Sequence, residues 1–497
     1  MDFIKEVVLT FSEYDKEEFI HFLARKRPNA ARKDVEIFKM IYSSYLKDNK
    51  IGENLKGSQN YHAIRKRISK ELENYLMLKS AKLKRFQKES RLMMVQYFIN
   101  LNKYEIAWEL LLKEEKEAVK SKNTFINVLV QRMKLQILPF YATEEFADTQ
   151  QKLLKLQKEQ SIEDQFQLYF IQIQNELKIK LIKGEVSVAG DLIKNTLNRY
   201  ELLKEVVLSP KTHLKIVEII RTEFLINRKY YLMVRTLSDY YQNIIHLFID
   251  KLNLEPELAR LEYIMAHACF HTRKFEKAKH HLLNVHELMK KNEDIKATLF
   301  VKHLSLDSSI NVFSGQIKDA IDAHEKFLNT EQYKTSEVEQ LNLSLNLVAY
   351  YCTIEDYNKA NRILIYMNKS SGYYQKKMGR EWLIRKDMIR VIAQVEIGNI
   401  EISLTILRNI KKQHKEMLKA EEYRLALHFV DFVISYLNEP FKISIKELDD
   451  FFIKFKLVKT KIFEDPKLLA FYSWMKARLL KKKLYAILLK EYEEINE

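Results

Sequence analysis

Apolar residues recur every three or four positions along most of the chain between residues 82 and 440, with polar residues in between. This spacing places the apolar side chains on one face of an α-helix and predicts amphipathic helices. One clear stripe consists of Ala278, Leu282, Val285 and Met289. The preceding helix has a matching stripe of Tyr263, Ala266 and Phe270. A single helix pair cannot bury both stripes, so the pattern also predicts that neighbouring pairs stack.

A short motif recurs in the same region: a polar turn, an aromatic or aliphatic residue, and a small residue three positions later. With weaker copies included, eight copies follow one another at intervals of about 42 residues, which is the length expected of one helix pair with its turns. The small residue allows two antiparallel helices to approach closely just after their turn. The predicted packing positions are Tyr104, Ala107, Ala189, Phe275, Ala278, Ala320, Tyr357 and Ala360.

This motif resembles that of the tetratricopeptide-repeat superfamily over roughly residues 82–440, most clearly at Tyr104–Ala107, Phe275–Ala278, Ile317–Ala320 and Tyr357–Ala360. The period is longer than the 34 residues of the standard repeat, and the Trp-Leu-Gly start and closing proline of that repeat are missing. The resemblance implies an all-α, right-handed superhelical array (an α-solenoid) of antiparallel helix pairs. It also implies a concave side that receives a peptide, a helix or a partner domain.

The two ends of the chain depart from the repeat. Residues 1–80 are expected to form a small basic domain with helices from about Glu13, with Ser12 as its cap, from Ala31 and from Asn60. Residues 81–440 are expected to hold about eight helix pairs. Residues 441–497 are expected to form a degenerate pair and a basic helix that caps the array.

Composition supports helices joined by short turns. The 497 residues include only 8 glycines and 6 prolines, whereas average usage would give about 35 and 25. Two cysteines cannot build a disulfide framework, and neither a signal peptide nor an apolar run of membrane-spanning length is visible. These observations favour a cytoplasmic protein that has no contact with a membrane.

The net charge of +17 is concentrated near the two ends of the chain. On the helix expected from Asn60, apolar residues form one stripe and cations occupy the other side, an arrangement suited to phosphate contacts. A second basic segment, residues 454–483, alternates with aromatic residues, as in proteins that bind RNA or single strands. Both segments are also compatible with ordinary solvated helix faces. The candidate nucleic-acid-binding residues are Arg65, Lys66, Arg67, Lys70, Lys481, Lys482 and Lys483.

No motif indicates catalysis, a cofactor or a metal. The chain contains no G-x-x-x-x-G-K-[ST], G-x-G-x-x-G or G-x-S-x-G sequence. His267 and His271 are spaced by four, as two metal ligands on one helix would be, but no acidic residue completes a H-E-x-x-H pattern. The sequence therefore predicts a protein that is not an enzyme.

Three functions remain open. The first is a protein-interaction scaffold or adaptor that binds a partner protein or peptide through its repeats. The second is a transcription regulator with a DNA-binding N-terminal domain and a repeat domain for sensing or dimerisation. The third is an RNA- or ribosome-associated factor that uses both basic ends. The identity of the partner and the oligomeric state do not follow from the sequence.

Overall fold

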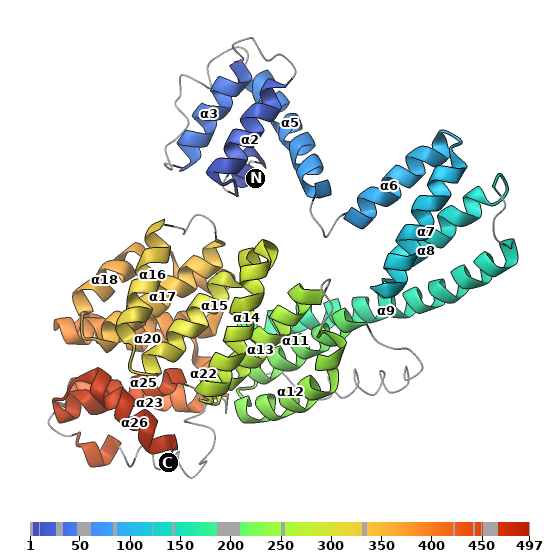
Figure 1. The fold of residues 1–497 in the computed structure, drawn as a ribbon. Coiled ribbons are helices and arrows are strands. Elements are labelled where there is room, and N and C mark those ends of the chain that lie inside the picture. Colours follow the sequence, from blue (N-terminus) through green and yellow to red (C-terminus); the bar gives the residue numbers. More distant parts are fainter. Residues whose placement is uncertain are drawn as a thin grey trace. The chain divides into compact units, whose positions relative to one another are not determined.

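The computed structural model of the chain describes residues 3–8, 10–25, 33–46, 61–82, 87–121, 123–141, 145–185, 209–249, 254–330, 335–420, 423–440, 443–448, 450 and 466–496. All regular structure in these ranges is helical, and no strand occurs in them (Figure 1). The prediction of an all-α fold is therefore confirmed. The predicted packing residue Ala189 lies outside the described ranges.

The helices form two compact units, Met1–Gln165 and Phe166–Glu497, and helix α9 (Phe146–Lys183) contains the boundary between them. The division expected from the sequence, near residues 80 and 440, stays a prediction. Among the helices that the structure describes, none has both the length and the apolar character that a membrane crossing requires.

The first unit begins with four helices around an aromatic core: α1 (Phe3–Val8), α2 (Glu13–Ala24), α3 (Lys33–Leu46) and α5 (Tyr61–Lys82). Ser12 caps α2 as predicted, because its hydroxyl accepts a hydrogen bond from the Asp15 amide and the Asp15 carboxylate accepts one from the Ser12 amide. In the core, the ring of Phe19 lies 4.7 Å from that of Phe38. The predicted apolar stripe of α5 is buried, namely Tyr61, Ile64, Ile68, Leu72 and Tyr75.

The rest of the first unit contains α6 (Gln87–Asn100), α7 (Tyr104–Lys120) and α8 (Thr124–Ile137), which pack successively against one another. Ala107 is fully buried in their shared core, at the start of α7. Tyr104 stacks on Phe140, with ring centroids 4.9 Å and planes 8° apart. This aromatic pair lies where α7 begins and α8 has just ended.

Beyond α9, the described helices of the second unit are α11 (Pro210–Ile226), α12 (Tyr230–Ile244), the 3-10 helix η2 (Ile245–Leu247), α13 (Glu255–His271), α14 (Phe275–Lys291), α15 (Glu293–Phe313), α16 (Ile317–Thr330), α17 (Glu337–Thr353), α18 (Tyr357–Tyr366), α19 (Ser371–Met378), α20 (Arg380–Ile397), α21 (Ile400–Gln413), α22 (Lys415–Lys419), α23 (Arg424–Asn438), α25 (Pro466–Leu480) and α26 (Leu484–Asn496). Most of these helices pack against the helix that follows them in the chain (Figure 1). Alternate helices also touch: α13 contacts α11 and α15, and α17 contacts α15 and α20.

The turns between paired helices share one backbone conformation. After α13, the amide of Arg273 donates to Phe270 and that of Lys274 donates to Cys269, the two hydrogen bonds of a Schellman motif. Such a turn needs one residue in the left-handed region, a place usually taken by glycine. This glycine-poor chain uses glycine at Gly184, Gly315 and Gly398, whereas five other described turns use larger residues with φ between 52° and 65°, namely Asn102, Arg228, Arg273, Glu355 and Lys481.

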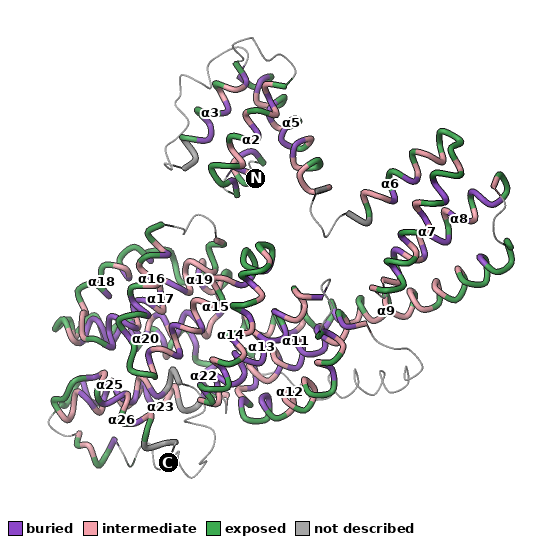
Figure 2. The backbone as a smooth tube through the Cα atoms, in the orientation of Figure 1, coloured by how far each residue is buried: buried purple, intermediate pink, exposed green. Residues whose placement is uncertain are grey.

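Five of the predicted packing residues belong to the second unit, where burial is concentrated on the sides of helices that face other helices (Figure 2). Ala278 and Ala360 are fully buried and Ala320 is 1% exposed. Phe275 is also buried, and Tyr357 is half-buried. A small buried side chain therefore lies near the start of α14, α16 and α18.

One buried carboxyl group in this unit should make the stability of the fold decrease as the pH rises. Glu223 on α11 is 3% exposed, and burial raises its pKa to about 7 although Lys229 and Lys180 act in the opposite direction. A folded-state pKa above the unfolded value favours the folded chain at low pH, and this contribution is lost as the pH rises from about 4.5 to about 7. We expect Glu223→Gln to increase the free energy of unfolding by about 1–3 kcal/mol at pH 8 and to have little effect at pH 4.

Urea unfolding at the two pH values tests this prediction, with the exposed Glu276→Gln as the matched control. Equal effects of Glu223→Gln at pH 4 and pH 8 would contradict it.

Candidate functional site

The second unit contains a cavity of about 350 Å³ between alternate helices. Its walls come from α13, α15, α17 and α20, and α25 and α26 of the C-terminal hairpin contribute the remaining side. Ligand pockets in proteins usually measure about 300–1,000 Å³, so this cavity has room for a small group or for one or two side chains of a larger partner.

A row of polar side chains crosses one part of the cavity wall. The Asn346 amide nitrogen donates to Ser305 Oγ at 2.9 Å, and Arg385 donates to Asn346 Oδ1 at 2.6 Å. Beside this row, Trp382 Nε1 donates to Asn342 Oδ1 at 2.9 Å. These bonds join α15, α17 and α20 and fix the orientation of both amides, so the polar surface is formed before any ligand arrives.

The other part of the cavity is apolar. One to two turns beyond Arg385 on α20, Ile389 and Ile392 line the cavity, and Val312 and Phe313 line it at the end of α15. The hairpin adds Phe471, Leu484 and Leu488. The cavity therefore pairs a hydrogen-bonding region with an apolar one, the combination typical of binding pockets.

Charged and titratable groups near the cavity have distinct surroundings. Lys302 lies exposed on α15, whereas Arg385 is half-buried. The Glu339 carboxylate accepts hydrogen bonds from the amide and hydroxyl of Ser336 and so belongs to the N-terminal cap of α17. Burial raises the pKa of the Tyr350 hydroxyl to about 12, with Ser309 and Arg385 acting to lower it and Asp307 acting to raise it.

The cavity also contains a cysteine whose surroundings disfavour a thiolate. Cys352 is buried in α17, and burial raises the pKa of its thiol to about 12, which the charge of Glu396 reinforces. Reactive cysteines instead have a lowered pKa beside cationic groups. Cys352 therefore carries a proton at neutral pH and packs as a small apolar side chain.

The C-terminal hairpin is held by residues far away in the sequence. Glu355, in the turn between α17 and α18, accepts hydrogen bonds from the Leu484 amide at 2.8 Å and from Lys483 Nζ at 3.0 Å. Tyr485 donates to the Val312 carbonyl at 2.8 Å, and the ring of Tyr492 stacks on Phe275. Glu355 thus serves as an N-terminal cap for α26, a role normally filled by a residue adjacent in sequence.

Several of the candidate nucleic-acid-binding residues have partners within the protein. Arg67 Nε lies 3.3 Å from the carboxylate of Asp34, which is fully buried. Arg65 donates to the Tyr61 hydroxyl at 3.2 Å, while Lys66 and Lys70 are exposed on α5.

The C-terminal lysines of the candidate set lie in the second unit, between α25 and α26. Lys481 and Lys482 form the Schellman turn between α25 and α26, and their side chains are exposed. Lys483 bonds to Glu355, as described above.

The histidine pair singled out by the sequence lines the cavity without forming a metal site. The rings of His267 and His271 are 4.6 Å apart, and Tyr230 stacks on His271. In the part of the chain that the structure describes, no group of three or more His, Cys, Asp and Glu side chains is arranged to hold a metal ion.

The polar row has a signal in the sequence, which is the regular spacing of its members. Asn346 follows Ser305 by 41 residues, and Arg385 follows Asn346 by 39, so the three occupy equivalent positions in successive helix pairs. Aligning the repeats and searching for polar residues at one position of the first helices would have found the row. Periodicity of apolar residues alone could not reveal it.

Comparison with known proteins assigns no family to the chain. No family model matches the sequence, and no curated protein is significantly similar to it. The function is therefore inferred from the cavity and its surroundings.

Proposed function

We propose that the chain is a non-enzymatic interaction protein that binds a segment of a partner polypeptide in the cavity of its second unit. The observation that carries the proposal is the cavity itself, in which a row of oriented amide and hydroxyl groups adjoins an apolar region. A polypeptide supplies what both regions require, because its main chain donates and accepts hydrogen bonds and its side chains include large apolar groups.

The proposal includes a tetratricopeptide-like, right-handed array whose concave side holds the cavity. Its support is the contact pattern of the second unit, in which alternate helices α13, α15, α17 and α20 touch and together line the cavity. In arrays of helix pairs, the first helix of each pair lines an extended binding surface. The size of the cavity suits an anchoring side chain and its flanking main chain.

Filling the cavity tests this function. Ala349 on α17 lines the cavity, and Ala349→Phe adds a ring there without removing any of the polar groups named above. In affinity purification of the full-length chain from its native cells, we expect a defined protein partner to be retained by the wild type and depleted at least tenfold by Ala349→Phe. The matched control is Ala297→Phe, at an exposed position of α15.

Thermal unfolding of both variants must first show a folded chain. A partner that Ala349→Phe retains as well as the control does would overturn the proposed site.

Nucleic-acid binding is the second candidate, supported by the exposed Lys66 and Lys70 in the first unit and Lys481 and Lys482 in the second. Clusters of solvent-exposed cations are the usual contacts to phosphates. The same purification with nuclease separates the two functions. Partners that disappear on nuclease treatment, regardless of Ala349→Phe, would favour nucleic-acid binding over the cavity.

A further inference from the structure

One arginine on α11 continues the polar row of the cavity wall toward the start of the second unit. Tyr263, which lines the cavity from α13, precedes Ser305 by 42 residues, and Arg221 on α11 precedes Tyr263 by 42 residues. Contacts on this face follow the same interval, because Glu218 and Arg260 are also 42 residues apart and form an ion pair between α11 and α13. The guanidinium carbon of Arg221 lies 5.9 Å from the centre of the Tyr263 ring. Arg221 therefore occupies on α11 the position that Tyr263 occupies on α13 and Ser305 on α15.

The guanidinium of Arg221 has neither a hydrogen bond nor an ion pair with any residue that the structure describes. Its Nε atom is buried and unbonded, although the residue as a whole is only half-buried. Glu218, one turn earlier on α11, is bonded to Arg260. Tyr263 stays neutral at neutral pH, because burial raises the pKa of its hydroxyl although Arg221 acts to lower it. Two guanidinium groups therefore share one carboxylate on this face.

The unpaired cation is costly to the folded chain. Burial lowers the pKa of the Arg221 guanidinium, and the charges of Tyr263 and Glu218 oppose this only in part. An arginine side chain nevertheless stays protonated at neutral pH. The fold thus carries a partly desolvated charge whose hydrogen bonds are not made, a feature that a bound ligand would complete. A carboxylate fits best, because it accepts two parallel, charge-assisted hydrogen bonds from a guanidinium.

We infer that Arg221 binds a carboxylate of the same partner segment that the cavity holds. This inference rests on the proposed function and adds a charged anchor to it. The carboxylate has two sources, an aspartate or glutamate side chain or the C-terminus of the partner, and both present the same group to Arg221. A nucleic-acid strand suits the site less well, since surfaces that bind such strands neutralise several phosphates and this face leaves one cation unpaired.

The place of Arg221 in the array sets the spacing within the ligand. Helix α11 contacts α13, and α13 contacts α15. Packed helices lie about 8–10 Å apart, so Arg221 is roughly 16–20 Å from Ser305 along the array. An extended peptide spans about 3.3–3.6 Å per residue, and the carboxylate therefore lies about five or six residues from the part of the segment that bonds to the polar row.

Peptide selection on the immobilised full-length chain tests this arrangement. Random twelve-residue peptides are selected, the enriched ones are synthesised with free and with amidated C-termini, and their binding is measured by fluorescence anisotropy. We expect binders in which a carboxylate lies about five or six residues from a large apolar residue. Loss of binding on amidation would identify the C-terminus, whereas loss when an acidic side chain is replaced by its amide would identify that side chain.

The variant Arg221→Met should weaken the selected peptides about tenfold or more, since it removes a charged hydrogen-bond donor. It should leave the free energy of unfolding unchanged or increased, because it also removes an unpaired, partly buried cation, whereas a purely structural arginine would be missed by the fold. Arg221→Glu should instead select peptides with lysine or arginine at the same spacing. The matched control is Arg235→Met, at an exposed position of α12.

The outcomes separate the inference from the function beneath it. Peptides that are lost with Ala349→Phe but bind Arg221→Met as tightly as the wild type would retain the cavity and overturn the carboxylate site. Peptides weakened by Arg221→Met but not by Ala349→Phe would retain the carboxylate site and overturn the cavity. Peptides insensitive to both variants, or an absence of binders, would overturn both. Displacement of the peptides by oligothymidylate at physiological salt would overturn the choice of a carboxylate in favour of a phosphate.

Discussion

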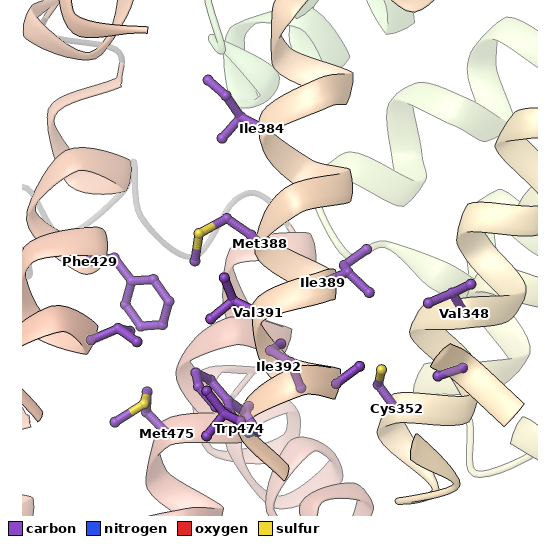
Figure 3. Packing of buried hydrophobic residues seen from close by; sticks show 14 of the residues in the cluster. Val348, Cys352, Ile384, Met388, Ile389, Val391, Ile392, Phe429, Trp474 and Met475 are labelled. Atoms are coloured by element: carbon purple, nitrogen blue, oxygen red, sulfur yellow. The ribbon is translucent and has the colours of Figure 1, made fainter. Parts of the chain in front are cut away.

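Replacing Trp474 with alanine will lower the free energy of unfolding of the second unit by about 3–5 kcal/mol. Trp474 on α25 is 1% exposed and packs in the largest core cluster of this unit, near Val391, Ile392 and Met475 (Figure 3). Alanine would leave a cavity that the surrounding helices can only partly fill. It would also remove the 2.8 Å hydrogen bond from the indole nitrogen to Glu396.

The measurement is urea unfolding of the full-length chain followed by fluorescence. With Trp108 of the first unit replaced by phenylalanine, Trp382 remains as a reporter of the second unit in every variant. Trp474→Phe is the control, because it keeps most of the ring and loses mainly the hydrogen bond, so it should cost only about 1–2 kcal/mol. A loss below 1 kcal/mol for Trp474→Ala would show that the hairpin does not belong to the core.

The second large effect is expected in the first unit, where Glu115→Ala should destabilise the α7–α8 pair by about 3–5 kcal/mol. The side chain of Lys134 is fully buried, and its ammonium lies 2.6 Å from the Glu115 carboxylate. Burial alone would raise the pKa of Glu115, but hydrogen bonds from Lys134 and Gln131 outweigh it and lower the pKa. Removing the carboxylate takes this ion pair away from a buried cation, whose desolvation is then compensated less well.

Amide exchange in α7 and α8 of the full-length chain measures this loss locally. Glu109→Ala, at an exposed position of α7, is the matched control and should change little. The double change Glu115→Ala and Lys134→Met removes both charges and should recover much of the lost stability. The interpretation fails if the double variant is as unstable as Glu115→Ala.

Local structure followed closely from the sequence. The spacing of apolar residues predicted the buried stripe of α5, and Ser12 was predicted as the cap of α2 because a serine side chain can accept a hydrogen bond from the first amides of a helix. These features depend on residues within one or two turns of each other. Interactions between residues so close in sequence do not depend on how the helices pack together. The periodicity of apolar residues and the type of the capping residue are therefore enough to predict them.

The backbone conformation of the turns and the long-range contacts could not be predicted in the same way. The motif located polar turns before Phe275 and Tyr357, but sequence reasoning assigns a left-handed residue to glycine. The left-handed conformation of Arg273, Glu355 and Lys481 therefore did not follow from residue type. Contacts of Glu355 with Lys483 and Leu484 join residues 128 and 129 positions apart. The packing of whole helices determines such contacts. The sequence around Glu355 or around Lys483 therefore does not indicate them.

The same limit affected the choice of candidate binding residues. Counting charge marked Arg67 and Lys483 as contacts for phosphates, but a count cannot show that Asp34 and Glu355 lie beside them. The sequence pattern does not single out Asn346 or Arg385, because isolated polar residues are common in apolar helices. Their significance comes from the alignment of three helices that brings them into one row.

The measurement that tests the account most directly is amide hydrogen exchange of the full-length chain with and without the protein partner that the wild type retains in affinity purification. A ligand in the cavity should slow exchange in the segments that line it, around residues 301–313 of α15, 339–353 of α17 and 385–392 of α20. The account predicts this protection in the wild type and its loss in Ala349→Phe. Protection confined to α5, or elsewhere in the first unit, would contradict the claim that the cavity is the binding site.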